Sequence, residues 1–79
     1  PASAGLLEAP SGIELRNELL YVSDNATGRI SAFTRAGERV NYIETGLPKG
    51  SLAGINFGPD GKLYFVDMVG HRVFRVDPI

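Results

Sequence analysis

Two stretches of the chain repeat one pattern 43 residues apart, counted from Leu20 to Leu63. Residues 20–34 read LYVSDNATGRISAFT, and residues 63–77 read LYFVDMVGHRVFRVD. Leu, Tyr, Asp and Arg recur at corresponding places, with apolar bulk kept at several places between them. In each stretch two short apolar runs flank a cluster of turn-forming residues, which is typical of a β-hairpin. The repeat therefore predicts two copies of one β-rich unit.

Further apolar runs complete each unit. Ile13 and Leu15 alternate with polar residues, as a half-buried strand requires, and Ile55 and Phe57 repeat them 42 residues later. Residues 58–61, Gly-Pro-Asp-Gly, are typical of a hairpin turn. No stretch of the sequence shows the periodicity of a helix. We expect strands at residues 12–15, 19–23, 29–34, 40–44, 52–57, 62–67 and 72–77.

The spacing of the units indicates the fold. Four short antiparallel strands in every 42 to 43 residues are typical of a β-propeller blade, whose repeats span about 40 to 50 residues. The sequence thus predicts an all-β chain with two four-stranded antiparallel propeller blades. Residues 10–47 are the first blade, and residues 48–79 are the second, which lacks its outer strand. In the N-terminal segment, residues 1–9, Leu6-Leu7-Glu8 is a candidate outer closing strand.

The length of the chain makes association with further blades an expectation. A chain of 79 residues buries only about 60% of its unfolded surface, and without cysteine it has no disulfide to stabilise a thin core. Blades are sheets with two apolar faces, so two blades alone leave apolar surface in water. We expect a homo-oligomer, most simply a trimer that closes a six-bladed ring by strand exchange, or the remaining blades of a parent protein as partners.

Charge and hydropathy exclude several classes of partner. Eight Lys and Arg against nine Asp and Glu leave a net charge of −1, so no basic field attracts nucleic acid. No apolar run reaches the roughly 18 to 20 residues of a membrane helix, so we expect no membrane partner. The start at Pro1 predicts processing or excision from a longer chain, and Ala2-Ser3-Ala4 slightly favours an extracytoplasmic location, although three small residues arise more often by chance.

Six short segments carry a resemblance to a known repeat family. They are residues 10–13, 20–24, 28–30, 54–55, 61–67 and 70–73. These segments resemble the NHL repeat over about residues 10–77, which implies a six-bladed propeller that binds proteins or ligands, with enzymes in some branches. The sequence departs from the family pattern at Leu52-Ala53-Gly54, where the opening Pro is lost, and at Gly28, where the family usually has His. Such folds do not dictate one function.

The second unit, through its Gly-Pro-Asp-Gly at residues 58–61, also resembles the gluconolactonase and strictosidine-synthase-like propellers. For the metal-dependent members, the resemblance implies an Asn before the Gly of the first strand and an Asp at the end of the second strand. Here Ser11 and Ala53 occupy the Asn place, and only Asp24 and Asp67 match. Half of the implied ligand set is missing. A segment of a metal-dependent propeller hydrolase or lyase is therefore the alternative function.

Asp24 and Asp67 end corresponding strands, and Arg29 and Arg72 follow them across the turn. One hypothesis makes these four residues structural braces, in which the carboxylate accepts turn N–H groups and faces the Arg. Repetition favours the braces, because a catalytic residue is needed once whereas a brace is needed in every blade. In the alternative hypothesis, carboxylates of several blades converge and hold Ca²⁺. We expect no cofactor, with Ca²⁺ at Asp24 and Asp67 as the alternative.

His71 is the only histidine of the chain. A zinc site needs several ligands, so a structural contact in the turn is favoured at His71 over a ligand contact. The sequence has no Ser-His-Asp set, P-loop or dinucleotide-binding motif, and no catalytic residue is predicted. It favours a non-catalytic module for ligand or protein binding and assembly over an enzyme.

Overall fold

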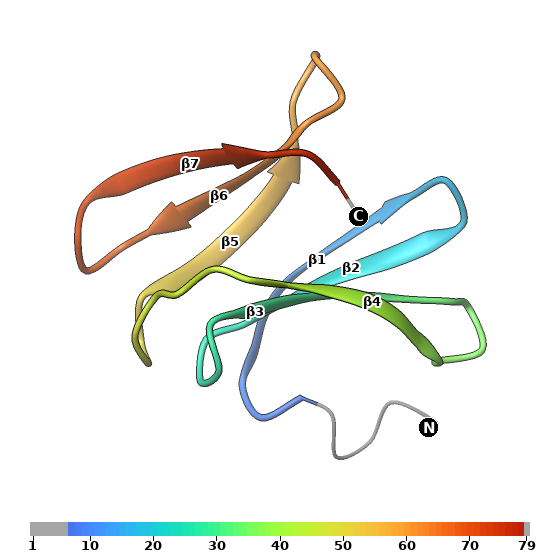
Figure 1. Cartoon of the computed structure of the whole chain (residues 1–79), viewed down its shortest axis with the longest axis horizontal. Coiled ribbons are helices and arrows are strands. Elements are labelled where there is room, and N and C mark those ends of the chain that lie inside the picture. The colour runs from blue at the N-terminus through green and yellow to red at the C-terminus, as the bar shows by residue number, and fades with distance from the viewer. Residues whose placement is uncertain (1–6, 79) are drawn as a thin grey trace.

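Seven β-strands make up residues 7–78, the part of the chain that the computed structural model describes (Figure 1). These residues contain no helix. The strands are β1 (Pro10–Arg16), β2 (Leu19–Asp24), β3 (Arg29–Phe33), β4 (Arg39–Glu44), β5 (Leu52–Phe57), β6 (Leu63–Asp67) and β7 (Arg72–Val76). The predicted all-β class is confirmed, and the strand ends differ from the expected ones by no more than two residues.

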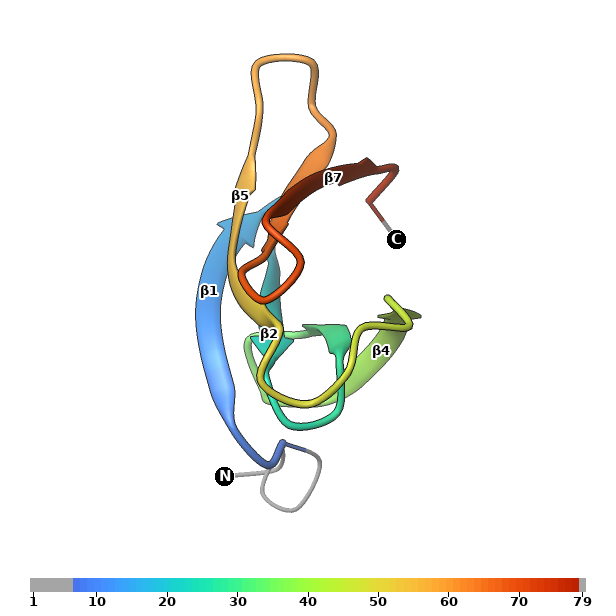
Figure 2. The same ribbon diagram turned by 90° about the vertical axis from the view of Figure 1, so that its left-hand side faces the viewer.

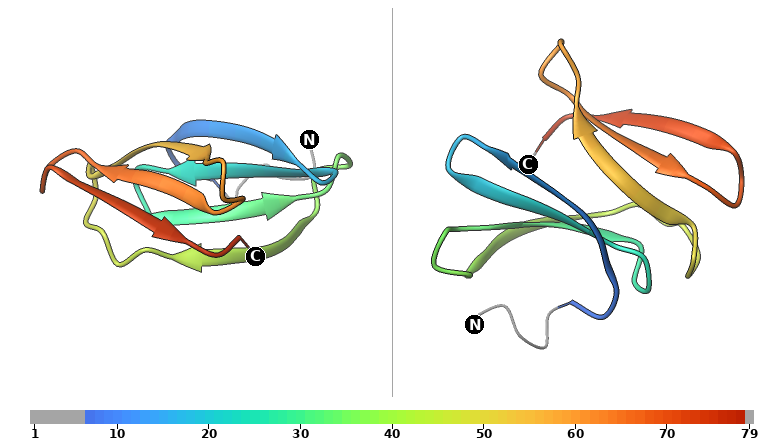
Figure 3. Two further views of the ribbon diagram at one scale, coloured as in Figure 1. Left: turned by 90° about the horizontal axis from the view of Figure 1, so that it is seen from above. Right: turned by 180° about the vertical axis from the view of Figure 1, so that it is seen from behind.

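The strands form two antiparallel sheets in which sequence neighbours pair. The first sheet has the order β1-β2-β3-β4, and the second has the order β5-β6-β7. Figure 2 shows β1 and β5 near each other at one edge of the molecule, with β4 and β7 at the opposite edge. The second sheet lies over the first, as the two views of Figure 3 show. The first strands of the two units therefore meet.

Tight turns connect the strands and fix their register. Asn17 and Glu18 form a two-residue turn between β1 and β2, and both have positive φ, 51° and 68°. Left-handed backbone at both turn positions matches the twist of the flanking strands. Gly61 has a φ of 79°, and its N–H donates to the Gly58 carbonyl at 3.0 Å. The turn expected at residues 58–61 is thus present between β5 and β6.

Strand alternation decides which side chains face the other sheet. Successive residues of a strand point to opposite faces, so Tyr21 shares one face with its cross-strand partner Ala32. The ring of Tyr21 meets the ring of Phe57 edge-on, with 5.0 Å between their centroids. The buried cluster between the two sheets consists of Tyr21, Ile30, Ala32, Leu47, Leu52, Ile55, Leu63 and Phe65.

Polar contacts join the two sheets where β1 approaches β5. The Ser11 hydroxyl donates to the Leu52 carbonyl at 3.1 Å, and the Asn25 side-chain amide donates to the same oxygen at 2.8 Å. Gly12 permits this approach, because a Cβ there would lie only 3.3 Å from the backbone nitrogen of Ile55. The two sheets are therefore held by directional bonds at one edge and by apolar packing across their faces.

The segment before β1 differs from an outer strand. The closing strand expected at Leu6-Leu7-Glu8 begins outside the described residues, and its described part forms no strand in the single chain. The Ala9 carbonyl accepts the Asn25 N–H at 2.8 Å, just as the Ser51 carbonyl accepts the Met68 N–H at 2.9 Å. Ala9, just before β1, thus has the position in the first unit that Ser51, just before β5, has in the second.

Leu63 is fully buried between the sheets. Leu63→Ala leaves a cavity there, and we expect the free energy of unfolding to fall by about 2 to 5 kcal/mol. Urea unfolding followed by circular dichroism measures the change. Val69→Ala is the matched control, because Val69 lies 63% exposed in a turn and its truncation should cost less than about 0.5 kcal/mol. Equal losses in the two variants would contradict the assigned core.

Candidate functional site

Asp24 ends β2 with a carboxylate that is almost fully buried, at 1% exposure. One oxygen accepts the N–H groups of Ala9 at 3.1 Å, Ala26 at 3.0 Å and Thr27 at 3.4 Å. The other oxygen accepts the Glu8 N–H at 2.8 Å. A buried carboxylate requires such donors. Asp24 therefore ties the turn after β2 to the segment before β1.

The pKa of Asp24 lies below its ordinary value. Burial by itself raises the pKa, because it disfavours the charged form, but the hydrogen bonds from the four backbone N–H groups outweigh it. The carboxylate is consequently ionised at neutral pH, and the backbone N–H dipoles stabilise its charge.

Asp67 ends β6 at the corresponding place and has a different set of donors. One carboxylate oxygen accepts the Gly70 N–H at 2.8 Å, and the other accepts the Arg72 guanidinium at 2.9 Å. The Gly70 N–H and the Arg72 side chain hold the pKa of Asp67 below its usual value. Glycine is needed at position 70, because a Cβ there would lie 2.4 Å from the carboxylate. The Asp67–Arg72 contact has the geometry that the brace hypothesis requires.

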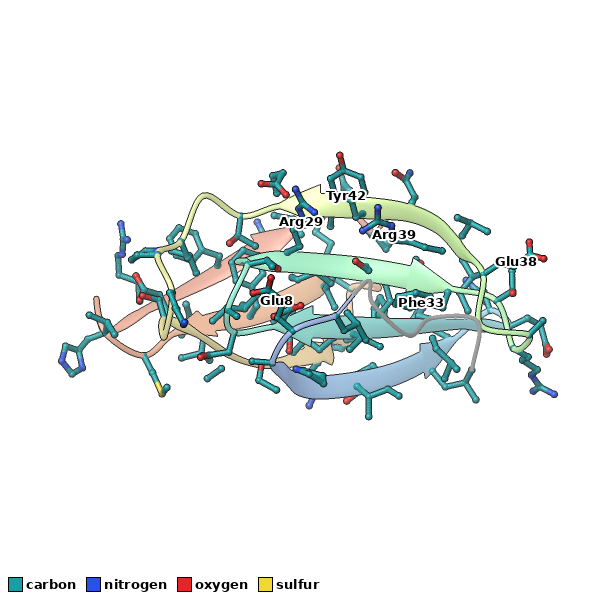
Figure 4. All side chains as sticks on the ribbon, turned by 90° about the horizontal axis from the view of Figure 1, so that it is seen from below. Glu8, Arg29, Phe33, Glu38, Arg39 and Tyr42 are labelled. Atoms are coloured by element: carbon teal, nitrogen blue, oxygen red, sulfur yellow. The ribbon has the colours of Figure 1, made fainter. Side chains whose placement is uncertain are left out.

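Arg29 has a different partner from its counterpart Arg72. Its guanidinium donates to the carboxylate of Glu44, which lies opposite on β4. It also lies over the ring of Tyr42, 5.1 Å from the centroid, and Figure 4 shows the two side chains together. The hydrogen bond that Arg29 donates to Glu44 raises the pKa of Arg29. Asp24 and Arg29 are cross-strand neighbours, yet no ion pair joins them in the described structure.

A metal site at Asp24 and Asp67 has few free ligands. The two carboxylates belong to different sheets, and both oxygens of each already accept hydrogen bonds. Within residues 7–78, no group of three or more His, Asp or Glu side chains is arranged to hold an ion. Ca²⁺ prefers six to eight oxygen ligands, so it would have to displace the N–H donors and recruit further oxygens.

His71 is exposed in the turn between β6 and β7, with a φ of 56°. Its counterpart Gly28 has a φ of 73°, so the repeat keeps the left-handed backbone although the residue changes. At Gly28 a Cβ would lie 2.5 Å from the Leu47 carbonyl oxygen. His71 carries a Cβ at this place, and the connection after β4 has no room for one at Gly28.

An apolar groove of about 600 Å³ lies on the face of the first sheet that points away from the second sheet. Ile13, Leu20, Val22 and Phe33 line it, together with Leu7 and residues 10–12 and 34–37. Figure 4 looks at the molecule from the side of this sheet. Sequence reasoning did not select these residues as a site, although the alternation of β1 and β2 places them on one face. The groove does not include His71.

Comparisons with known proteins identify no family for this chain. No protein-family model matches it, and a search of curated proteins gave no match. Residues 7–78 contain no helix long and apolar enough to cross a membrane.

Asp24 makes the fold sensitive to acid. Its folded pKa lies below the unfolded value of about 3.9, so the ionised carboxylate stabilises the fold above about pH 4 and loses this effect as the pH falls through the folded pKa. Asp24→Asn sets an NH₂ group against backbone N–H donors. We expect a loss of about 1 to 3 kcal/mol at pH 7 and a flatter decline in stability between about pH 4 and pH 2.

Thermal melts from pH 2 to pH 7 measure both effects of Asp24→Asn. Asp77→Asn is the control, because the Asp77 side chain is exposed and its ion pair with Lys62 lies on the surface. It should leave the melting temperature and its pH dependence nearly unchanged. A curve for Asp24→Asn that runs parallel to that of the unmodified chain would contradict the assigned role of this carboxylate.

Proposed function

We propose that the chain is a two-blade module of an NHL-like six-bladed β-propeller, and that it serves ligand or protein binding and assembly without catalysis. Two antiparallel meanders of one repeat pack face to face, with β1 beside β5, which supports this proposal. The connection between β4 and β5 crosses from the edge of the molecule that holds β4 and β7 to the edge that holds β1 and β5 (Figure 2). Blades that radiate from a common centre are connected in this way.

The observation that carries the proposal is the apolar surface that both sheets leave uncovered. Ile13 and Leu15 are 63% and 55% exposed on the first sheet, and Val66 and Val73 are 40% and 70% exposed on the second. Soluble monomers rarely leave large contiguous apolar patches in water, and such patches mark sites of association. A homo-oligomer covers these faces, and three copies close a ring of six sheets.

The repeated Asp turns support a structural rather than a catalytic role for these carboxylates. Backbone N–H donors stabilise the charge of Asp24, Arg72 pairs with the charge of Asp67, and both side chains are buried. A general base or metal ligand needs an oxygen free to meet a proton or a cation. A binding and assembly module requires no such group.

A metal-dependent hydrolase or lyase is the second candidate. It is favoured by the position of Asp24 and Asp67 at the ends of corresponding strands. Ser11, which stands where those enzymes have Asn, donates its hydroxyl to the Leu52 carbonyl and so joins the two sheets. This use of Ser11 favours the assembly module over the enzyme.

The assembly proposal predicts the mass of the protein in solution. Light scattering coupled to size exclusion should give three times the chain mass of 8.5 kDa. The apolar outer faces drive this association, so it should persist at high salt, where surface ion pairs are screened. A well-folded species with the mass of one chain contradicts the proposal.

Metal binding separates the two candidate functions. For the assembly module, we expect neither Ca²⁺ nor Zn²⁺ nor a chelator to change the melting temperature. Occupancy of a real site at 100 times its Kd would add about 2.7 kcal/mol of stability. A metal-induced rise that Asp67→Ala abolishes and Asp77→Ala leaves intact would instead support the hydrolase or lyase.

A further inference from the structure

We infer that the outer face of the first sheet binds, head to tail and through its exposed residues Ile13 and Leu15, the outer face of the second sheet of another copy of this chain. The outer face of the first sheet carries Ile13 and Leu15, which are exposed, Leu20, which is half-buried, and Val22 and Phe33, which the chain itself already buries. The outer face of the second sheet carries Gly54, Asn56, Tyr64, Val66, Val73 and Arg75. The inference rests on the proposed function and identifies the surface through which the copies assemble.

The junction inside the chain is the template for this interface. There the inner face of the first sheet, which includes Tyr21, packs against the inner face of the second sheet, which includes Leu63. In the repeat, Tyr64 is the counterpart of Tyr21 and lies on the outer face of the second sheet. Leu20 is the counterpart of Leu63 and lies on the outer face of the first sheet. Each outer face thus repeats a face that already packs.

Gly54 provides an independent observation. Its counterpart Gly12 is closely covered by β5, since a Cβ at Gly12 would lie 3.3 Å from the Ile55 nitrogen and 3.4 Å from the Gly54 Cα. A Cβ at Gly54 would meet nothing within 4 Å, and its φ is not in the left-handed region. Neither packing nor backbone conformation within one chain requires glycine there. In the assembly, β1 of the next copy passes over Gly54 as β5 passes over Gly12.

The apolar contacts of the template have apolar counterparts at the interface. Inside the chain the ring of Tyr21 packs on the ring of Phe57. Between copies, Tyr64 meets Leu15, which stands 42 residues before Phe57. The aromatic contact is replaced by an aromatic–aliphatic one, so burial of apolar area is retained and the edge-on ring pair is lost.

A head-to-tail interface determines the symmetry of the assembly. Each chain offers one face of each kind, so the interface is heterologous and leaves both types of face open until a ring closes. Two sheets in each copy give six sheets in a closed ring of three. An interface between two identical faces would stop at a dimer.

Two variants each damage one of the two faces. Gly54→Val fills the open space on the second sheet, and Ile13→Asp places a charge on the first sheet at a residue that is 63% exposed in the single chain. We expect each variant to keep its β-sheet circular dichroism and to fall about threefold in mass, from three chains to one. Asn41→Asp is the control. Asn41 pairs with Ala32 on the face of the first sheet opposite to Ile13, so this variant adds the same charge outside both outer faces and should leave the mass unchanged.

Mixing the two variants tests the direction of the interface. Gly54→Val retains an intact first face and Ile13→Asp retains an intact second face, so an equimolar mixture can form one interface and no ring. We expect light scattering over a tenfold range of concentration to approach twice the chain mass, whereas neither variant alone exceeds one chain.

Each other outcome of these experiments counts against a specific statement. An unmodified chain that is monomeric overturns the proposed function. An assembled unmodified chain whose mass neither variant changes, or variants whose mixture stays monomeric, overturns the head-to-tail interface while leaving the assembly intact. Loss of the β-sheet signal in Gly54→Val would show that Gly54 is packed within one chain, and it also overturns the inference.

Discussion

Apolar side chains on both faces of each sheet are the constraint on which this structure depends. Strand alternation sends Tyr21 to one face of β2, and Leu20 and Val22 to the other. A sheet with one apolar face can expose its other face to water, whereas a sheet with two apolar faces must be covered on both. The second sheet covers one face of the first, and Asn25 and Ser11 fix the distance between them by bonds to Leu52. The apolar groove on the first sheet and the exposed Val66 and Val73 on the second lie on the faces that this pairing does not cover.

The two Asp turns show how a repeat keeps a role while its contacts change. In the second unit Asp67 accepts a hydrogen bond from the Arg72 guanidinium. No fourth strand lies beside β7 within the described residues. In the first unit β4 places Glu44 opposite Arg29, and the Glu44 carboxylate forms an ion pair with the Arg29 guanidinium. Asp24 is then stabilised by the backbone instead. A neighbouring strand, rather than the turn itself, therefore decides which acid the arginine contacts.

Local patterns were enough to predict the strands and turns, because alternation and turn-forming residues report directly on backbone geometry. The positions of Asp24 and Asp67 at strand ends followed from the same patterns. The Arg29–Glu44 pair was not predictable from the turn, since it depends on the register of β4 against β3. The place of residues 7–9 beside β1 depends on the bonds of Ala9 with Asn25 and Asp24, which join segments far apart in sequence.

Gly28 and His71 occupy corresponding turns of the two units and distinguish them. After β4 the Thr45 hydroxyl donates to the Gly28 carbonyl at 2.6 Å, and the Leu47 carbonyl lies where a Cβ of residue 28 would be. His71 keeps the backbone conformation but adds the Cβ. The β4–β5 connection passes close to Gly28. Because His71 has a Cβ, a chain that continued from a strand beside β7 would have to pass farther from His71. Packing of one sheet face on another needs no such connection, so it can cover the second sheet whatever path the chain follows.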